Sequence, residues 1–389
     1  MQSRHLILLP CSDALRFLGA AIALSGPDVR ALEAVSPPHE EWGRVSALAA
    51  REGVRPLAFW RLREAGLLDG LPADVVADWQ ADFDLTQARN AVMLSEAEQL
   101  LRALSSGGLS VACLKGAVFA EGIYPHPAVR PMTDIDLLVL PHQVGRAASI
   151  LGDCGYRRAP TAQQDHVYVK GCETGAQPFG CTVELQHDLL TGRFGNRKVA
   201  RLRVEELWDD MTDARVGATP CLTLSPVHCL LFLAAHMAIH HGAFRLLWLA
   251  DVAYYLASTD GLDWERLVEC AGRYGLRAAL GWSLRLSRDF VSARVPDAVL
   301  AELNVLGRPT GALGATSWEE FSRDARIVAR AAFLDSAIDR LLYLSAIALR
   351  PTGEGRPQVG SDAEPGRPPL WRLAVRFARA LRTLRRVGP

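Results

Sequence analysis

Apolar positions recur with two different periods along the chain, and the period changes near residue 108. Before that point the spacing is helical, which predicts helices over residues 13–24, 40–51, 55–65 and 73–104. Between residues 109 and 190, short apolar runs bounded by glycine or proline predict strand, helix, strand, helix, strand and strand. After Ser225-Pro226, a typical helix start, helical spacing returns and predicts helices over residues 226–241, 244–258, 264–274, 277–291 and 296–306, and a pair of helices over about residues 318–349.

This order of elements predicts an α+β (mixed) fold, in which a small α/β core with a central sheet lies between two helical regions. The order of the strands in the sheet cannot be read from the sequence. The predicted regions are an N-terminal helical region (1–107), the α/β core (108–215), a C-terminal helical region (216–350), a Pro/Gly-rich linker (351–369) and a basic amphipathic tail (370–389). In the tail, Leu370–Arg386 has leucines along one side and arginines without any acid elsewhere. It either contacts a membrane or an acidic partner weakly, or packs its apolar side on the body.

Charge and cysteine content limit the classes of function. The chain has 389 residues with 43 basic and 43 acidic side chains, so no global field favours nucleic acid or an anionic membrane. Eight cysteines occur without a Cys-x-x-Cys pair, which is typical of reduced core residues in a cytoplasmic protein. No stretch reaches the roughly 20 apolar residues that a membrane span needs.

Two acids interrupt the start of the apolar run Ile135–Leu140, which follows the break at Pro131. On a strand, Asp134 and Asp136 point to one face, roughly 7 Å apart along the backbone. Such a pair repels and loses solvation, and a divalent cation with oxygen ligands relieves both costs. The alternative is a turn with two solvated aspartates before a strand.

A third acid lies in the run Cys181–Leu190. Glu184 stands between two apolar residues, as Asp136 does, and shares its face with Gln186 and Asp188. If the two strands are neighbours, three carboxylates meet and can hold two Mg²⁺ ions.

These residues together resemble the uncharacterised bacterial nucleotidyltransferase family of the DNA polymerase β-like superfamily. The motifs that carry the resemblance are Leu114-Lys-Gly116, Arg130–Val139, Val183-Glu-Leu185 and Arg245–Asp251. The chain departs from the family pattern twice. It has Gly116-Ala117 where the superfamily has Gly-Ser or Gly-Gly, and Gln186-His187 where the family has His-Trp.

The resemblance implies a small polymerase β-like nucleotidyltransferase α/β core with a mixed sheet, and it also implies a chemistry. Asp134, Asp136 and Glu184 would be catalytic and would bind Mg²⁺, or Mn²⁺ in its place, with a nucleoside triphosphate (NTP) as substrate. Gly116 would let the backbone approach the phosphates at the start of a helix. Lys115 and Arg130 would neutralise the β- and γ-phosphates. The alternatives are a surface lysine at a strand end and, for Arg130, a structural salt bridge with an aspartate.

The C-terminal region adds candidates without an assigned role. His236 and His240 have the i, i+4 spacing of a zinc pair but lack the glutamate of a zinc protease motif. We expect them, with His241, to face the core or the active-site cleft. Asp251 is either an acid on the helix surface or a contact to the nucleotide or its acceptor.

Three hypotheses follow. The first is a Mg²⁺-dependent nucleotidyltransferase that moves a nucleoside monophosphate to a hydroxyl of a small molecule, peptide or protein; nucleic acid is disfavoured as acceptor because the core is not basic. The second is a catalytically silent nucleotide-binding or partner-binding module with the same fold. The third is a metal hydrolase that uses His236 and His240.

Overall fold

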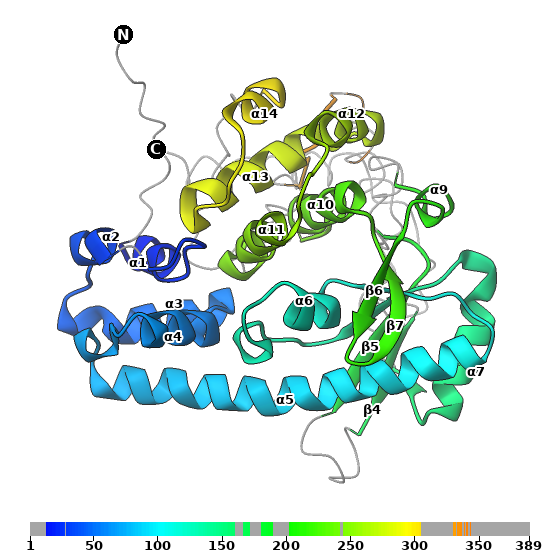
Figure 1. Ribbon diagram of the computed structural model, residues 1–389, viewed down its shortest axis with the longest axis horizontal. Helices are drawn as coiled ribbons and strands as arrows, with labels where there is room; N and C mark the ends of the chain where they lie inside the picture. Colours follow the sequence, from blue (N-terminus) through cyan, green and yellow to red (C-terminus); the bar gives the residue numbers. More distant parts are fainter. Residues whose placement is uncertain are drawn as a thin grey trace, which may run out of the picture.

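The fold is described from a computed structural model (Figure 1). The described residues are 13–27, 29–159, 166–171, 180–189, 202–241 and 244–304, together with residues 330, 331, 333–336, 338, 340 and 343. The predicted linker, the basic tail and most of the helical segment predicted over residues 318–349 lie outside the described residues.

The N-terminal region is helical, as the apolar spacing predicts. Its helices are α1 (Asp13–Ala21), α2 (Val29–Ala34), α3 (Trp42–Glu52) and α4 (Arg55–Glu64), and they lie together at one end of the molecule (Figure 1). Gly53 ends α3 in the left-handed conformation, which glycine adopts without steric cost. The short helix α2 is a difference from the prediction, because it has too few residues to show a helical period.

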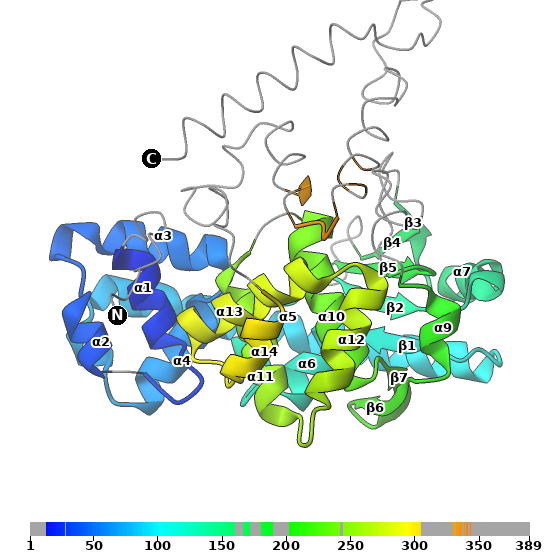
Figure 2. The same ribbon diagram turned by 90° about the horizontal axis from the view of Figure 1, so that it is seen from above.

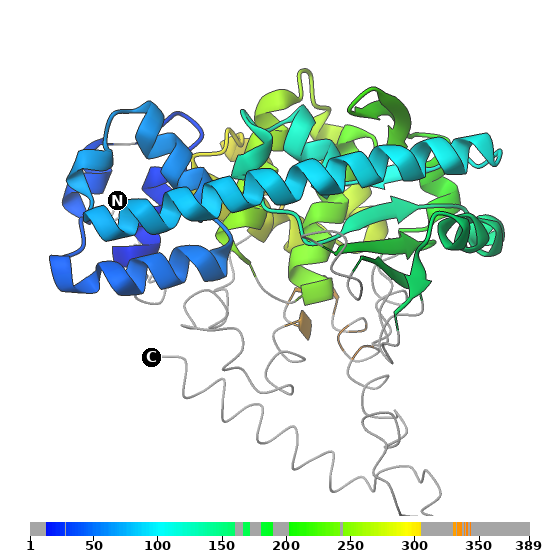
Figure 3. The same cartoon turned by 90° about the horizontal axis from the view of Figure 1, so that it is seen from below.

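Helix α5 (Ala73–Ser106) connects the N-terminal helices to the sheet. Its 34 residues contain no internal glycine or proline, so nothing in the sequence interrupts it. Figure 3 shows α5 crossing the molecule from the N-terminal helices to the strands. The prediction over residues 73–104 is confirmed to within two residues of its end.

The strands of the described residues form one seven-stranded mixed sheet. The strands are β1 (Ala112–Leu114), β2 (Ile135–Leu138), β3 (Arg157–Arg158), β4 (Val167–Lys170), β5 (Cys181–Gln186), β6 (Thr212–Val216) and β7 (Thr219–Thr223). Their order across the sheet is β3-β4-β5-β2-β1-β7-β6. Helix α6 (Gly116–Gly122) follows β1, and α7 (Val144–Asp153) follows β2. The predicted α+β class with a mixed sheet is confirmed.

The hairpin of β6 and β7 extends the sheet beyond the predicted core. β7 pairs in parallel with β1, so the sheet continues to Thr223, and the boundary placed at residue 215 falls inside β6. Threonines and a proline mix with few large apolar residues in this hairpin, so its alternation is too weak to predict strands.

The faces of the sheet belong to two hydrophobic cores. Ile135 and Leu137 on β2 pack into a core with α5, α7 and the inner strands. Leu138 points the other way, into a larger core that it shares with the helices at both ends of the chain. Because strand side chains alternate, Asp136 lies on the face of Leu138, toward the C-terminal helices.

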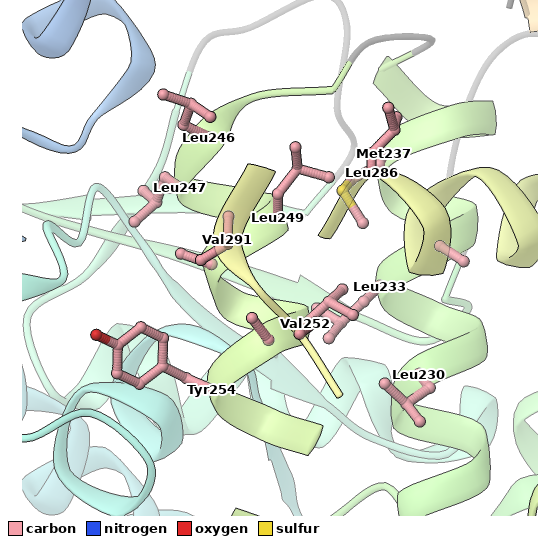
Figure 4. Close-up of a cluster of buried hydrophobic side chains, with 14 of the residues drawn as sticks. Leu230, Leu233, Met237, Leu246, Leu247, Leu249, Val252, Tyr254, Leu286 and Val291 are labelled. Atoms are coloured by element: carbon pink, nitrogen blue, oxygen red, sulfur yellow. The ribbon is translucent and has the colours of Figure 1, made fainter. Parts of the chain in front are cut away.

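The C-terminal helices lie next to the strands, mostly on the side of the N-terminal helices (Figure 2). They are α9 (Val204–Trp208), α10 (Pro226–Ala235), α11 (Leu246–Ser258), α12 (Trp264–Tyr274), α13 (Arg277–Val291) and α14 (Asp297–Glu302). Leucines and valines of α10, α11 and α13 meet in a dense cluster (Figure 4). In the described residues, no helix is long and apolar enough to cross a membrane.

The helix predicted over residues 226–241 is only partly α-helical in the structure. The segment predicted as a single helix over residues 226–241 ends its regular part at Ala235, and a π-helical turn, η5 (His236–His241), follows. Apolar periodicity cannot distinguish an α-helix from a π-helical turn of this length, because both are defined by backbone hydrogen bonds.

Candidate functional site

The three predicted acids meet at the junction of β2 and β5. These strands are parallel neighbours, and the register places Asp136 directly opposite Glu184. Asp134 precedes β2 on the same side. One carboxylate oxygen of each of the three residues lies within 4.8 Å of the others, and we call this group the carboxylate triad. Asp134 and Glu184 are half-buried and Asp136 is 1% exposed. The turn with two solvated aspartates is therefore not what the structure shows for Asp136.

Asp136 is held by a neighbour that the sequence analysis did not place in the site. Gln186, two residues beyond Glu184 on β5, donates from Nε2 to Asp136 Oδ1 at 2.7 Å. The Asp136 Oδ2 atom is buried and accepts no aligned hydrogen bond from the described residues. Its charged neighbour is the Lys115 ammonium, with Nζ at 3.2 Å. A buried carboxylate oxygen that accepts no aligned hydrogen bond, together with two neighbouring acids, provides oxygen ligands of the kind that a divalent cation prefers.

Burial is the largest single influence on the pKa of both Asp136 and Lys115, but the nearby charges decide the outcome for Lys115. Burial raises the pKa of Asp136 to about 7; Lys115 opposes that rise, while Asp134 and Glu184 add to it. For Lys115, burial lowers the pKa, but the attraction of Asp136, Asp134 and Glu184 outweighs it and leaves the pKa above its ordinary value. The ammonium therefore stays charged and compensates part of the negative charge of the carboxylate triad.

The backbone of Lys115 is strained. Its φ of 31° and ψ of −118° form a conformation that glycine adopts readily and that costs other residues about 1–3 kcal/mol. The side chain is 13% exposed and its Nζ also lies 3.2 Å from His236 Nε2. Lys115 is thus a largely buried lysine with two polar partners, and not the surface lysine of the alternative interpretation.

Gly116 follows Lys115 at the start of α6. A Cβ atom added at Gly116 would meet the Asp134 carbonyl oxygen at 3.5 Å and the Met132 sulfur at 3.9 Å, which are ordinary contacts. The fold itself therefore does not require glycine here. Helix α6 has only seven residues, and its start is buried.

Arg130 was predicted to neutralise phosphates, and the structure gives its guanidinium another partner. Nε and Nη2 each donate to one carboxylate oxygen of Asp251 at 2.8 Å, and Tyr124 donates its hydroxyl to the same carboxylate. Arg130 is 5% exposed and Asp251 is 1% exposed. Burial lowers the pKa of Arg130, but Asp251 outweighs this effect and holds it above its ordinary value. The contacts correspond to the structural salt bridge that was the alternative for Arg130.

Asp251 was interpreted as either an acid on the helix surface or a contact to the nucleotide or its acceptor, and its contacts agree with neither interpretation. It is not on the surface of α11, and its carboxylate is occupied by Arg130 and Tyr124 rather than open to a ligand. A helix residue flanked by apolar neighbours gives a signal of burial, but its partner, 121 positions away, could not be identified from spacing.

Asn90 positions the turn that leads into β2. It is fully buried on α5, where its Nδ2 donates to the carbonyl oxygens of Pro127 and Arg130, at 2.7 and 2.8 Å. Its Oδ1 accepts from the backbone N–H of Met132 at 3.3 Å. The available signal was an asparagine, a poor helix former, in the middle of a long helix.

The histidines of η5 lie beside this site. His236 Nε2 is 3.1 Å from His241 Nε2, and the ring of His240 stacks on that of His236 with centroids 5.6 Å apart. Parallel stacked rings do not converge on a shared ion. Among the described residues, the group of three or more ligand side chains that converges is the carboxylate triad. The geometry gives no support to a zinc pair of His236 and His240.

A pocket of about 690 Å³ opens where β5 ends. Its lining includes His187 and Asp188, which follow Gln186 in the chain, and Arg203, Glu206 and Tyr274 from the segments before and within α9 and α12. Charged groups of both signs line it. The pocket therefore begins at His187, the residue directly after the glutamine that contacts the carboxylate triad.

Comparisons with known proteins agree with this geometry. A family model described as "uncharacterised nucleotidyltransferase" matches residues 38–292, which is more than half of the chain and includes the carboxylate triad, Lys115 and η5. The comparison with curated proteins gave no match, and neither did the comparison with solved structures. The match confirms the resemblance inferred from the sequence motifs. The chain belongs to this family of uncharacterised nucleotidyltransferases, and hence to a family of transferase enzymes.

Proposed function

We propose that the protein transfers a nucleoside monophosphate from an NTP to a hydroxyl group of a small molecule, peptide or protein and releases pyrophosphate. The observation that carries the proposal is the carboxylate triad, whose ligand atoms lie within 4.8 Å of one another on two adjacent strands of a nucleotidyltransferase-family chain. Asp134, Asp136 and Glu184 have the catalytic role in this proposal, as metal ligands.

The residues of the triad fit a divalent cation. Asp136 has a buried oxygen without an aligned hydrogen bond, and like charges on Asp134 and Glu184 raise its pKa further. Oxygen ligands of this kind suit Mg²⁺ and also Mn²⁺. A bound cation would neutralise triphosphate charge and lower the pKa of the acceptor hydroxyl.

The protein's own residues contribute binding and orientation. Gln186 fixes one oxygen of Asp136, so the other oxygen keeps a defined direction. The Lys115 ammonium lies 3.2 Å from Asp136 Oδ2, where it can also form an ion pair with a phosphate group of the bound NTP. Gly116 leaves room for a phosphate oxygen because it has no side chain.

The pocket at the end of β5 supports a compact acceptor. A volume of about 690 Å³ is within the range of sites for small molecules, and its charged lining suits a polar ligand. A peptide or protein hydroxyl that enters this pocket is equally compatible. The neutral net charge continues to disfavour nucleic acid as acceptor.

Incubation with each of the four NTPs, labelled at the α-phosphorus, tests the proposal across a panel of hydroxyl acceptors that includes the protein itself. We expect label transfer and pyrophosphate release with Mg²⁺ or Mn²⁺, and a loss of at least a hundredfold in Asp134→Asn. Asp153→Asn, an exposed acid on α7, is the matched control and should behave as wild type. Transfer that persists in Asp134→Asn would contradict the proposal.

A silent module with the same fold is the second candidate. The observation that favours it is the Lys115 ammonium, which already compensates Asp136 in the way that a metal ion would. The alanine at position 117, where the superfamily has serine or glycine, also favours this candidate. This candidate, a nucleotide-binding or partner-binding module, predicts either that NTP binds without label transfer to any acceptor or that NTP does not bind at all.

A further inference from the structure

The π-helical turn η5 brings three histidines to one side of the chain. In a regular α-helix, residues five positions apart point about 140° away from each other. A π-helical turn closes its hydrogen bonds from i to i+5, which brings His241 over His236. The three rings are in contact, since the ring centroid of His241 lies 4.5 Å from that of His236 and 4.8 Å from that of His240. We call His236, His240 and His241 the histidine cluster.

Lys115 joins the histidine cluster to the carboxylate triad. Its Nζ atom lies 3.2 Å from Asp136 Oδ2 and 3.2 Å from His236 Nε2. A ligand that contacts both the triad and the histidine cluster would therefore also meet the ammonium group.

The histidine cluster has ring nitrogens to offer a ligand. His240 is half-buried, and neither of its ring nitrogens makes a hydrogen bond to the part of the chain that the structure describes. His241 uses Nε2 toward His236. Trp248 stacks on the His241 ring with centroids 4.5 Å apart, which fixes the plane of that ring.

The surroundings of the cluster are positive. Arg330 donates from Nη2 to the carbonyl oxygen of His241 at 3.4 Å, and Lys115 lies on the side of the triad. Burial first, and then these two cations, lower the pKa of His240 to about 4, so its imidazole is neutral and offers an N–H donor. Neutral N–H donors in a positive environment favour an anion.

A polyphosphate chain fits these two neighbouring sites. Its oxygens can share a divalent cation with the carboxylate triad on one side and accept hydrogen bonds from N–H groups on the other. Arg130, which the sequence suggested for the second task, is already paired with Asp251. The hydrogen-bond donors must therefore come from other residues beside the carboxylate triad.

We infer that the histidine cluster, together with Lys115, binds the polyphosphate chain of the nucleotide and of the pyrophosphate product. This inference rests on the proposed nucleotidyltransferase function, which supplies the ligand. It assigns the π-helical turn a role in substrate binding, whereas the alternative is a packed aromatic cluster without a ligand.

Calorimetric titration with inorganic tripolyphosphate in the presence of EDTA tests the histidine cluster apart from any metal ion or nucleoside. The full-length wild type is compared with His240→Phe/His241→Phe, which keeps two stacked rings and removes their nitrogens. We expect the double variant to bind tripolyphosphate at least tenfold more weakly. His39→Phe, at an exposed position, is the matched control and should bind as wild type. His240→Gln/His241→Gln restores side-chain N–H donors and should recover most of the affinity.

Each outcome decides the inference. Equal affinity in wild type and the double phenylalanine variant would overturn it, as would the absence of tripolyphosphate binding to wild type. If the phenylalanine variant does not fold, the imidazole ¹⁵N resonances of wild type are followed while tripolyphosphate is added. A shift at His240 or His241 supports the inference, and no shift at either residue overturns it. A parallel titration with ATP separates a free polyphosphate ligand from a nucleotide.

The same experiments separate the inference from the proposed function. Histidine-dependent tripolyphosphate binding without label transfer would retain the anion site and remove the nucleotidyltransferase proposal. Label transfer by wild type, combined with unchanged tripolyphosphate binding in the double phenylalanine variant, would retain the nucleotidyltransferase proposal and remove the anion site.

Discussion

Replacement of Asp251 by alanine tests whether Arg130 serves the fold or the ligand. The wild-type carboxylate accepts from Arg130 Nε and Nη2, both at 2.8 Å, and from the Tyr124 hydroxyl. In Asp251→Ala, the guanidinium stays buried against the Phe119 ring without its counter-charge. The backbone of Arg130 is also held by Asn90, so the side chain cannot easily turn to water.

The expected magnitude follows from this burial. Breaking a buried ion pair by removing one partner costs about 3–5 kcal/mol, because an uncompensated charge remains in a region of low dielectric constant. Loss of the Tyr124 hydrogen bond adds to that cost. Total stabilities of about 5–15 kcal/mol are typical, so Asp251→Ala should lower the urea midpoint greatly or prevent folding.

The assay is urea unfolding followed by far-UV circular dichroism. Asp260→Ala, an exposed acid just beyond α11, serves as the control and should change the free energy of unfolding by less than about 0.5 kcal/mol. Arg130→Met/Asp251→Leu removes both charges and should recover most of the stability lost in Asp251→Ala.

Two results would refute this reasoning. One is an Asp251→Ala variant as stable as Asp260→Ala. The other is an Arg130→Met variant of wild-type stability that loses NTP binding, since that would return Arg130 to the phosphate role predicted from the sequence.

Three further predictions concern the site itself. Lys115→Gly should unfold at a higher temperature than Lys115→Ala by an amount equivalent to about 1 kcal/mol, because glycine relieves the positive φ and both variants lack the ammonium; equal stability would contradict the strain. The folded pKa of Asp136, about 7, exceeds the value of about 3.9 in the unfolded chain. The metal-free folded state therefore binds more protons, and its stability should fall as pH rises from about 4 to about 7; in EDTA, Asp136→Asn should flatten the urea midpoints measured across this range. Gly116→Ala should keep wild-type thermal stability, because its Cβ meets ordinary contacts, yet weaken NTP binding in calorimetry; unchanged affinity would show that no phosphate approaches this backbone.

The sequence predicted much of the fold because its boundaries are marked by strong local signals. Helix α12 (Trp264–Tyr274) and helix α13 (Arg277–Val291) were predicted with their observed bounds, since each has a clear apolar period and Gly275 ends the first. The carboxylate triad was also predictable, because period-two alternation places Asp134, Asp136 and Glu184 on matching faces of two strands.

The remaining parts of the site depend on contacts between distant segments. Lys115 and His236 are 121 positions apart, and Gln186 and Asp136 are 50 apart, so no local pattern connects them. The strained φ of Lys115 and the π-helical hydrogen bonds of η5 are backbone properties that side-chain patterns do not encode.

The most direct test of the central claim is calorimetry of each NTP with Mg²⁺, performed on wild type and on Asp134→Asn/Asp136→Asn. The claim is that the carboxylate triad holds a divalent cation that takes part in nucleotide binding. We predict that wild type binds at least one NTP in a Mg²⁺-dependent manner and that the double variant, still folded by circular dichroism, binds it at least tenfold more weakly. Equal binding by the two proteins would contradict the claim, because the nucleotide would then bind without the triad.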